Sequence, residues 1–482
     1  MKKRNLPIAA SATVNAIDDL NACNIADYFE YEKGIDEVAE KMKRDIVYSE
    51  SVYDKSKKTF YVSNSGDDAN DGLSPETAWK TLDKINDPES VCENCNILFE
   101  RGGLWRGTVR VPHNNMTYSA YGVGMKPRLY GSLRNYAHPS FWKKTEYENV
   151  WCTTDCTMNI GLVAINHSDV FGKYDEIMCT RNIIGKDGYE GPQHLKGEYN
   201  FSSKVDEAVC YLYCDKGNPG DVYDSIELGE GYTLVAPTAN AKEGLFFDNL
   251  CIKYVGAHGI AGLGGRKNVT VQNCVFCYLG GSILPGFAGG NVVGFGNAVE
   301  TFGPCDGYYV NANWIYQIYD TAITHQYAPS NNDCRMNDVE YVGNLCELCH
   351  WSIEYYNNPS GGGHRTVSNV NVHHNVLRRG GYGWGSVGRE SGAALFNSFV
   401  LPEETENFNS YSNIYDRCAG GIIRFYKGGD EKIKNFNNTY IQKRSGYLGQ
   451  AYSDEMHPFD NAAEQILKYC KEENARFFYE AE

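Results

Sequence analysis

The sequence predicts an all-β fold, a parallel β-helix that carries an inserted β-rich subdomain and short helices at both ends. The main evidence is a repeated unit: an apolar residue, an outward residue, a short turn and a β-rich run. Examples are Gly259–Ala261 leading to Asn268–Phe276, Ala298–Glu300 leading to Gly307–Ile315, and the run Asn369–Leu377. Such a unit cannot bury its apolar side alone, so successive units must stack into a solenoid.

Length and charge agree with this fold and exclude several classes of partner. A chain of 482 residues is long for one compact core, but a solenoid core grows along one axis. The formal net charge of −16 would repel phosphate backbones and anionic lipid, so neither nucleic acid nor a membrane surface is an expected partner. No apolar run approaches the length of a membrane span.

The cysteines and the amino terminus predict a cytoplasmic protein. Met1–Ala10 has a basic start but no sustained apolar region, so we expect no secretory signal. The 17 cysteines then indicate reduced thiols rather than a disulfide framework. Cys346–His350 has the spacing of a haem attachment motif, but it lies inside a solenoid coil, and the Cys-x-x-Cys pairs are scattered. We therefore expect neither a metal nor a cofactor.

Changes in pattern divide the chain into five segments. Helical spacing from Ile17 to Met42 and from Ala462 to Cys470 places helices at the two ends, and the repeat disappears in the middle of the chain. The expected segments are an N-terminal helical appendage at 1–58, a cap with the first coils at 59–134, an inserted β-rich subdomain at 135–240, the main β-helix with the active site at 241–445, and a helical tail at 446–482.

The cap segment has a strand, a loop and a helix start. Thr59–Ser63 reads as a strand, and the acidic loop 67–71 that follows reads as a turn in preference to a calcium site. Ser74 is an N-cap residue and Pro75 suits the first helical position, so we expect a helix that runs through Ile85.

These residues carry a resemblance to a known superfamily. The stretch from Phe60 to Asp68 and then from Ser74 to Leu82 resembles the opening of right-handed parallel β-helix proteins of the pectate-lyase-like superfamily. In those proteins an amphipathic helix caps the open end of the solenoid. An insertion after the first coils also resembles the layout of the β-xylosidases of glycoside hydrolase family 120 and of family 141. The resemblance covers residues 59–440 in arrangement, implies a right-handed β-helix and a glycosidase, and matches no catalytic motif letter for letter.

Two carboxylates of the repeat are predicted on one exposed ribbon. Strands alternate faces with a period of two, so the inward ladder Ile260, Val299, Ile323, Ile353 and Ile422 has the outward successors Ala261, Glu300, Thr324, Glu354 and Ile423. Rungs about 4.8 Å apart place Glu300 and Glu354 near 10 Å at the backbone. Their carboxyl groups could reach the separation of either an inverting or a retaining glycosidase.

Asp320 is a third acid with the same outward parity as Thr324. Glycosidic cleavage needs a protonated acid beside the leaving oxygen and an ionised carboxylate at the anomeric side, and clustered acids separate their pKa values. We predict that Glu300, Asp320 and Glu354 are catalytic, without assigning which is the acid.

Polar and aromatic residues near the acids are the predicted substrate-binding wall. Two arginines on later coils would compensate the acids and could hold a substrate carboxylate or hydroxyls. The predicted substrate-binding residues are His325, Gln326, His350, Tyr355, Trp384, Arg389 and Arg424.

The leading functional hypothesis is a cytoplasmic glycoside hydrolase, β-xylosidase-like and exo-acting on short oligosaccharides. A polysaccharide lyase is the second hypothesis, in which Arg389 or Arg424 would neutralise a uronate carboxylate beside a base. A non-catalytic carbohydrate-binding solenoid is the third. The sequence does not decide the sugar, the linkage, the stereochemical outcome or whether the protein is a homo-oligomer.

Overall fold

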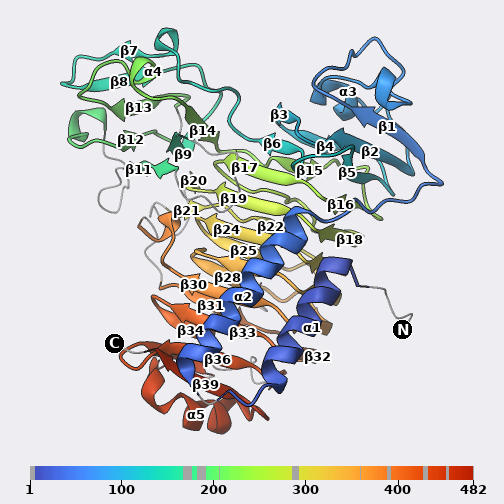
Figure 1. The fold of residues 1–482 in the computed structure, drawn as a ribbon, viewed down its shortest axis with the longest axis vertical. Coiled ribbons are helices and arrows are strands. Elements are labelled where there is room, and N and C mark those ends of the chain that lie inside the picture. Colours follow the sequence, from blue (N-terminus) through green and yellow to red (C-terminus); the bar gives the residue numbers. More distant parts are fainter. Residues whose placement is uncertain are drawn as a thin grey trace.

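The structure is a computed structural model of the chain. It describes residues 6–25, 27–166, 176–181, 191–205, 207–284, 293–358, 360–387, 392–426, 432–451 and 455–480. Figure 1 shows stacked strands that form a long solenoid, two helices laid along it, and two lobes at one end. The predicted parallel β-helix is confirmed, because strands distant in sequence pair in parallel along three sheets.

The first and second sheets each contain ten strands and run the length of the solenoid. The first sheet consists of β1 (Lys58–Val62), β2 (Cys95–Glu100), β5 (Thr117–Tyr121), β16 (Phe246–Asp248), β18 (Arg266–Gln272), β23 (Cys305–Asn311), β26 (Cys334–Val342), β29 (Arg365–His373), β32 (Glu404–Tyr411) and β35 (Ile433–Phe436). The second consists of β3 (Leu104–Arg106), β6 (Arg128–Tyr130), β17 (Cys251–Val255), β19 (Val275–Leu279), β24 (Trp314–Ile318), β27 (Leu345–Glu347), β30 (Val376–Gly380), β33 (Ile414–Cys418), β36 (Thr439–Lys443) and β39 (Arg476–Glu480).

The third sheet has seven strands, and it carries the predicted acids. Its strands are β22 (Val299–Phe302), β25 (Thr321–Tyr327), β28 (Trp351–Asn357), β31 (Ala394–Val400), β34 (Gly421–Phe425), β37 (Tyr447–Ala451) and β38 (His457–Pro458), of which the last pairs antiparallel. The pair β4 (Val109–Val111) and β15 (Val235–Pro237) continues this face through single bridges at Ile260.

Strand register places equivalent residues of successive coils in columns. In the first sheet Val271 pairs with Val310, Val310 with Tyr341, and Tyr341 with Val372, and all four side chains are buried. Because side chains alternate across a strand, every second residue points into this continuous core and its neighbours point outward. Each coil therefore extends one continuous core that it shares with the coils above and below it.

An asparagine ladder fixes the turn between the first and second sheets. The side-chain amide of each member donates to the side-chain oxygen of the next at 3.0–3.1 Å. Its members are Asn313, Asn344, Asn375, Asn413 and Asn438, and Glu472 closes its end by accepting from the backbone N–H of Asn438. The buried polar groups of this turn thus satisfy one another.

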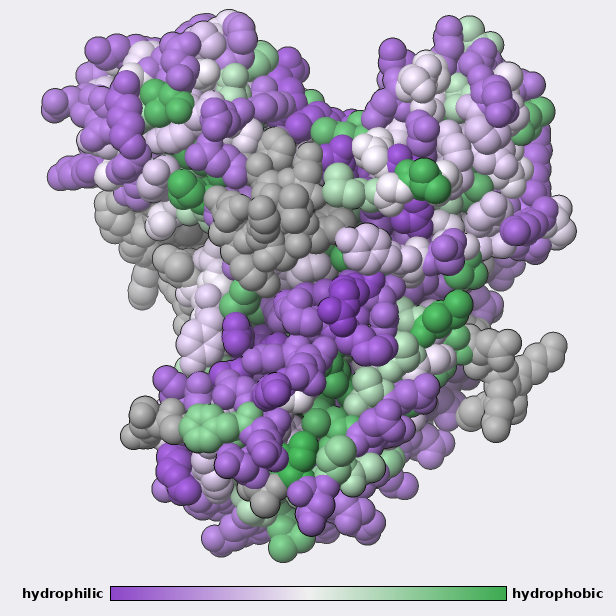
Figure 2. Space-filling view, viewed as in Figure 1, coloured by the Kyte–Doolittle hydropathy of each residue, from purple (hydrophilic) through white to green (hydrophobic). Residues whose placement is uncertain are grey.

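The N-terminal segment is a helical hairpin of α1 (Ile8–Ala22) and α2 (Tyr28–Val47) that covers the outer face of the second sheet (Figure 1). Figure 2 shows hydrophilic side chains over α2 and a hydrophobic strip between the two helices. Ion pairs fasten α2 to the sheet: Glu32 lies 2.7 Å from Arg417, Lys43 lies 3.1 Å from Glu347, and Asp36 binds Arg378.

The cap differs from the continuous helix that we expected. A short 3₁₀ turn, Pro75–Thr77, and the helix α3 (Leu82–Asn86) flank Trp79, which bridges to Val62. Ser74 caps the turn as predicted, and Pro75 occupies its first position. The helix is interrupted because the backbone of Trp79 exchanges hydrogen bonds with the β1 edge instead of with a helical turn.

The acidic loop before this turn uses its carboxylates in local hydrogen bonds. Asp68 accepts from the backbone N–H of Lys80 at 2.8 Å, and Asp71 accepts from that of Leu73 at 3.0 Å. These bonds are those of a structured turn.

The segment between the first coils and the main solenoid forms its own small core, in which Trp142, Phe201 and Leu228 are buried. It consists of two sheets: β7 (Lys143–Lys144), β8 (Val150–Thr153), β11 (Thr180–Arg181), β12 (Asn200–Ser202) and β13 (Cys210–Tyr213) in one, and β9 (Ile160–Ile165), β10 (Ile177–Met178) and β14 (Ile226–Glu230) in the other. It also contains the one-turn helix α4 (Pro219–Val222). The hairpin of β20 (Ser282–Leu284) and β21 (Val293–Phe295) lies beside the solenoid.

The tail begins with α5 (Ala462–Gln465) and a π-helical turn over Ile466–Cys470, where we expected a helix. The chain then returns to the solenoid as β39, a strand that the sequence analysis did not predict. Within the described residues, no helix has the length and apolar character needed to cross a membrane.

Candidate active site

One outward column of the third sheet contains two of the predicted acids. Glu300 pairs with Thr324, and Thr324 pairs with Glu354. The column continues through Asn397 to Arg424 on the next two coils. We call these five residues the acid column. The predicted separation of Glu300 and Glu354 by one rung is confirmed.

The predicted register fails on the last of these coils. Ile353 pairs with Phe396, and Phe396 pairs with Ile423, so Ile423 rather than Ile422 continues the inward ladder. The prediction was wrong because it assigned no coil to β31 and misjudged the following strand by one residue. Arg424, not Ile423, is therefore the outward residue on that coil.

Three side chains among the described residues donate to Glu354. Its Oε2 accepts from the hydroxyl of Thr324 at 3.0 Å and from that of Thr321 at 3.3 Å. The amide of Gln326, two residues along β25 on the same outward face, also donates to this oxygen. Gln326, a predicted binding residue, thus lies directly beside an acid.

Glu300 has a charged partner that the sequence analysis missed. Its Oε2 lies 3.0 Å from Nδ1 of His258 and 2.5 Å from the amide nitrogen of Asn297. Burial alone would raise the pKa of Glu300, but the charge and hydrogen bond of His258, with the bond from Asn297, outweigh it and lower that pKa. Burial in turn would lower the pKa of His258, yet Glu300 and then Asp320 raise it. Each residue of the pair thus favours the charged form of the other, and Nδ1 of His258 also lies 3.1 Å from the backbone nitrogen of Asn297.

Asp320 lies between the other two acids. The hydroxyl of Thr321 is 3.5 Å from Oδ1 of Asp320 and 3.3 Å from Oε2 of Glu354. The charge of Asp320 also acts on His258, the partner of Glu300. The three acids that the sequence analysis proposed are thus brought into one connected group.

This group is largely withdrawn from solvent. The exposed fractions of Glu300, Asp320 and Glu354 are 9%, 6% and 4%. In such an environment charges interact more strongly than in water, and the protonation state of each acid depends on its immediate neighbours.

Two predicted substrate-binding residues lie instead in the core. His325 and Tyr355 are each 0% exposed and pack edge to face, with ring centroids 4.9 Å apart. The imidazole of His325 faces the thiol of Cys305, and burial lowers its pKa to about 3. The prediction was wrong because both residues have the inward parity of their strands, opposite to Thr324 and Glu354.

Two further predicted binding residues, His350 and Trp384, form hydrogen bonds within the protein. His350 is buried, with Nδ1 3.3 Å from the hydroxyl of Ser386. Trp384 packs on Tyr319 and donates to the carbonyl of Gln317 at 2.8 Å.

Of the two arginines predicted to bind substrate, only Arg424 lies in the described residues. Arg424 ends the acid column, where it donates to the carbonyl of Gly392 at 2.9 Å and to the hydroxyl of Tyr426 at 2.6 Å. Arg389 lies outside the described residues.

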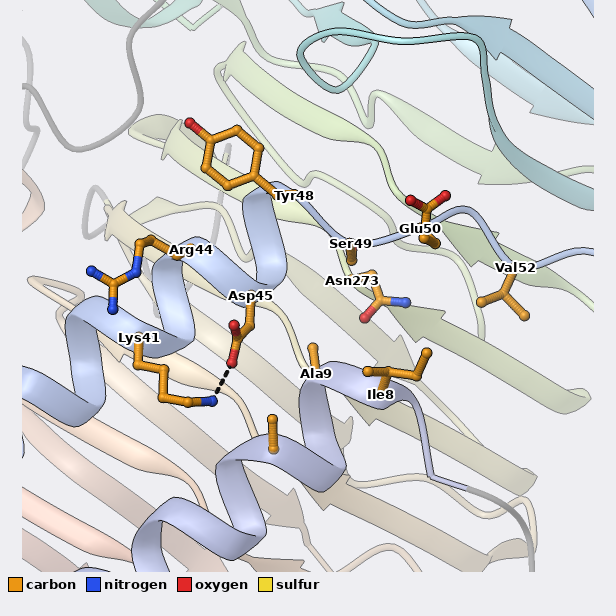
Figure 3. Close-up of a pocket in the computed structure, with 11 residues that line it drawn as sticks. Ile8, Ala9, Lys41, Arg44, Asp45, Tyr48, Ser49, Glu50, Val52 and Asn273 are labelled. Atoms are coloured by element: carbon orange, nitrogen blue, oxygen red, sulfur yellow. Dashed lines mark hydrogen bonds and ion pairs between the residues drawn. The ribbon is translucent and has the colours of Figure 1, made fainter.

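A separate pocket lies at the N-terminal hairpin (Figure 3). It has a volume of about 420 Å³ and includes the ion pair of Lys41 and Asp45, whose charged atoms are 2.6 Å apart. Asn273, from the turn between the first and second sheets, also lines it, whereas none of the predicted site residues does. This pocket is distinct from the acid group on the third sheet.

The residues that the sequence analysis missed lie where the third sheet begins. His258, Asn297 and Thr321 occupy equivalent positions on three successive coils, two residues before Ile260, Val299 and Ile323. The signal was available, because the same alignment that placed the acids also aligns these three polar residues. They were overlooked because the analysis followed only the residue after each inward position.

Among the described residues, no group of three His, Cys, Asp or Glu side chains converges as metal ligands do. All 17 cysteines are free thiols.

No protein-family model matches the chain, and no curated protein sequence is similar to it. Several solved structures are distantly similar to it. A glycoside hydrolase is 11% identical, with 80% of this chain and 93% of that one covered and a TM-score of 0.42. The complex of XylC with xylose is 10% identical, covers 87% of this chain and 82% of that one, and has a TM-score of 0.41.

A third similar structure is the family 28 exopolygalacturonase of Yersinia enterocolitica, which is 10% identical. The match covers 76% of this chain and 68% of that one, with a TM-score of 0.33. The chain is thus distantly similar in structure to glycoside hydrolases.

Proposed function

We propose that the protein is a glycoside hydrolase whose reaction takes place at the acid group of the third sheet. The observation that carries the proposal is the pairing of two carboxylates, two rungs apart on one face, with different partners. Glu300 faces the imidazole of His258, and among the described residues Thr321, Thr324 and Gln326 donate to Oε2 of Glu354. Glycosidic cleavage requires one ionised and one protonated carboxyl, and unlike environments separate such roles.

In this proposal Glu300 is the ionised group and Glu354 the general acid. Because the pKa of Glu300 is lowered, the proton for the leaving oxygen is assigned to the other carboxyl of the column, that of Glu354. That proton passes to the glycosidic oxygen as its bond to the anomeric carbon breaks. Glu300 then either attacks the anomeric carbon or removes a proton from the water that attacks it. Asp320 supports the charge of His258 beside Glu300.

Variants of the two acids, assayed on aryl glycosides with different leaving groups, test these roles. Glu354→Gln is expected to lose about 10²–10⁴-fold in kcat/KM on glycosides with poor leaving groups, which need protonation, and far less on activated ones. Glu300→Gln is expected to lose activity on both kinds of substrate. Glu404→Gln, on the exposed surface of β32, is the matched control and should keep parental activity.

The outcomes separate the competing functions. If Glu300→Gln and Glu354→Gln both match the parent, the proposed site is wrong. An unsaturated product released from uronate glycans, seen by its ultraviolet absorbance, would indicate a lyase. Binding without turnover on any glycan would indicate a carbohydrate-binding solenoid.

We further propose a cytoplasmic location, on the basis of the 17 free cysteines. Fractionation of cells that express the untagged protein tests it, and recovery outside the cytoplasm would contradict it.

A further inference from the structure

A row of aromatic side chains runs beside the acid column. Each of them lies two residues after a member of that column and therefore has the same outward parity. We call these residues the aromatic row: Phe302, Tyr356, Phe399 and Tyr426, which follow Glu300, Glu354, Asn397 and Arg424. Side chains two residues apart on one face of a strand are separated by about 7 Å. A ligand that contacts an acid thus also reaches the aromatic residue beside it.

The aromatic row is open to solvent, unlike the three acids. Phe302 is 47% exposed, and Tyr356, Phe399 and Tyr426 are each partly exposed. Removing large apolar side chains from water is favourable, and aromatic rings contribute the largest areas. A ligand can therefore reach this row from solvent, and covering the rings would favour its binding.

A β-bulge places Phe399 in the row. Tyr355 pairs with Ser398, whereas Tyr356 pairs with Val400, so Phe399 is an extra residue of β31 opposite Tyr356. The ring centroid of Phe399 lies 5.7 Å from that of Tyr356 and 5.3 Å from that of Tyr426. Bulges change the direction of a side chain and are frequent beside active sites. The sheet thus leaves its regular register where the aromatic row passes Glu354.

A regular aromatic stack on the first sheet provides a comparison. Tyr411 pairs with His373 and Phe436 on the neighbouring coils, and its ring is within 2° and 4° of parallel to theirs. In the aromatic row the ring of Tyr356 instead stands at 83° to that of Phe399. The face-to-face stacking between coils is therefore broken beside Glu354.

We propose that Tyr356, Phe399 and Tyr426 bind the leaving group of the substrate. This assignment rests on the proposed function, in which Glu300 acts at the anomeric carbon and Glu354 protonates the leaving oxygen. The direction from β22, which carries Glu300, to β28, which carries Glu354, continues to β31 and β34. The leaving group then lies over these last strands. The substrate class is a glycoside whose leaving group has a flat apolar face, supplied by an aromatic ring or by the C–H face of a second sugar.

Binding of substrate analogues that resist hydrolysis gives the first test. Thioglycosides of xylose, glucose, galactose and arabinose, each with a methyl, a phenyl or a second glycosyl group on the sulfur, are titrated into the parent by calorimetry. For at least one sugar, the phenyl or the glycosyl compound should bind about three- to tenfold more tightly than the methyl compound. Which of the two does so distinguishes an aryl from a saccharide leaving group. If no sugar shows such a preference, or none binds, the proposal is wrong.

Variants of the aromatic row give the second test. Tyr356→Ala and Phe399→Leu should bind the methyl compound as the parent does and lose the preference for the larger group, whereas Phe399→Tyr should keep it. Tyr411→Ala, in the stack on the first sheet, is the matched control and should keep it too. A preference that survives both Tyr356→Ala and Phe399→Leu, or that Tyr411→Ala also abolishes, overturns the proposal. Thermal unfolding of each variant shows that the protein titrated is folded.

These readouts separate the inference from the proposed function. A preference that depends on the aromatic row, with no hydrolysis of any glycoside, would support the inference and contradict the glycosidase. Hydrolysis that depends on Glu300 and Glu354, with the same preference in the parent and in both row variants, would do the reverse.

Discussion

Nδ1 of His258 lies 3.0 Å from Oε2 of Glu300, although the two residues belong to different coils of the solenoid. Each raises or lowers the pKa of the other in favour of the charged form. His258, on the neighbouring coil, thus affects the ionisation of Glu300, a proposed catalytic group. The two residues are 42 positions apart in the sequence and meet only because the coils stack. This contact predicts how kcat/KM and stability depend on pH.

His258→Gln should shift the acidic limb of the pH profile of kcat/KM to higher pH. The neutral side chain no longer holds the pKa of Glu300 low, so more acid-side activity is lost. The measurement is kcat/KM against pH on an activated aryl glycoside. His364→Gln is the control, because His364 forms a similar contact with Glu404 at 2.9 Å in solvent. An unchanged acidic limb in His258→Gln would contradict the role of His258.

The contact between His258 and Glu300 should stabilise the folded protein over a defined pH range. The raised pKa of His258 gives stabilisation that is complete below 6.5 and is lost as pH rises through the folded-state value. The lowered pKa of Glu300 gives stabilisation that is present above 4.5 and is lost as pH falls through its folded-state value. Urea unfolding should therefore show the largest difference between the parent and His258→Gln from pH 4.5 to 6.5. A difference that is larger at about pH 9 would count against this linkage.

Glu472, at the end of the asparagine ladder, should make the parent less stable as pH rises. Burial raises its pKa from 4.5 to about 7, against the opposing bonds from Tyr440 and Asn438. The folded state keeps a proton that the unfolded state has lost, so stability falls between pH 4.5 and about 7, by at most about 3 kcal/mol. Glu472→Gln should flatten this dependence in urea unfolding. Parallel curves for parent and variant would contradict it.

Arg378→Met should loosen the N-terminal hairpin. Nε of Arg378 lies 2.6 Å from Asp416, and the same guanidinium binds Asp36 of α2. Removing one partner of a buried ionic network costs about 3–5 kcal/mol. Amide hydrogen exchange should therefore accelerate in α2 before it does in the sheets. Lys33→Met, which removes an exposed contact of 3.9 Å with Glu37, should leave exchange unchanged.

The solenoid and the acid column were predictable because both follow from local periodicity. A period of two assigns faces, and a repeat aligns coils, so Glu300 and Glu354 could be placed together without coordinates. Gln326 has the same outward parity, although it was chosen for its chemistry. These assignments needed only the strand pattern and the assumption that coils stack in register.

The failures arose where parity was ignored or where the chain left the repeat. His325 and Tyr355 were chosen for their chemistry, although their parity pointed inward. His258 was missed because the analysis followed only the residue after each inward position, whereas His258 lies two residues before Ile260. The position of Phe399 could not be predicted, because a bulge shifts the register of one strand pair and the strand pattern does not reveal it.

The hairpin across the second sheet has a consequence for the order of folding. Tyr31 binds Thr439 across a sequence separation of 408 residues, and Arg476 reaches Asn21 across 455. During synthesis at about 5–20 residues per second, α1 and α2 leave the ribosome tens of seconds before their docking partners exist. The first helices to be synthesised can therefore complete their docking only after the last coils are made, and chains that end before β39 would leave uncovered the part of the hairpin that packs on Phe478.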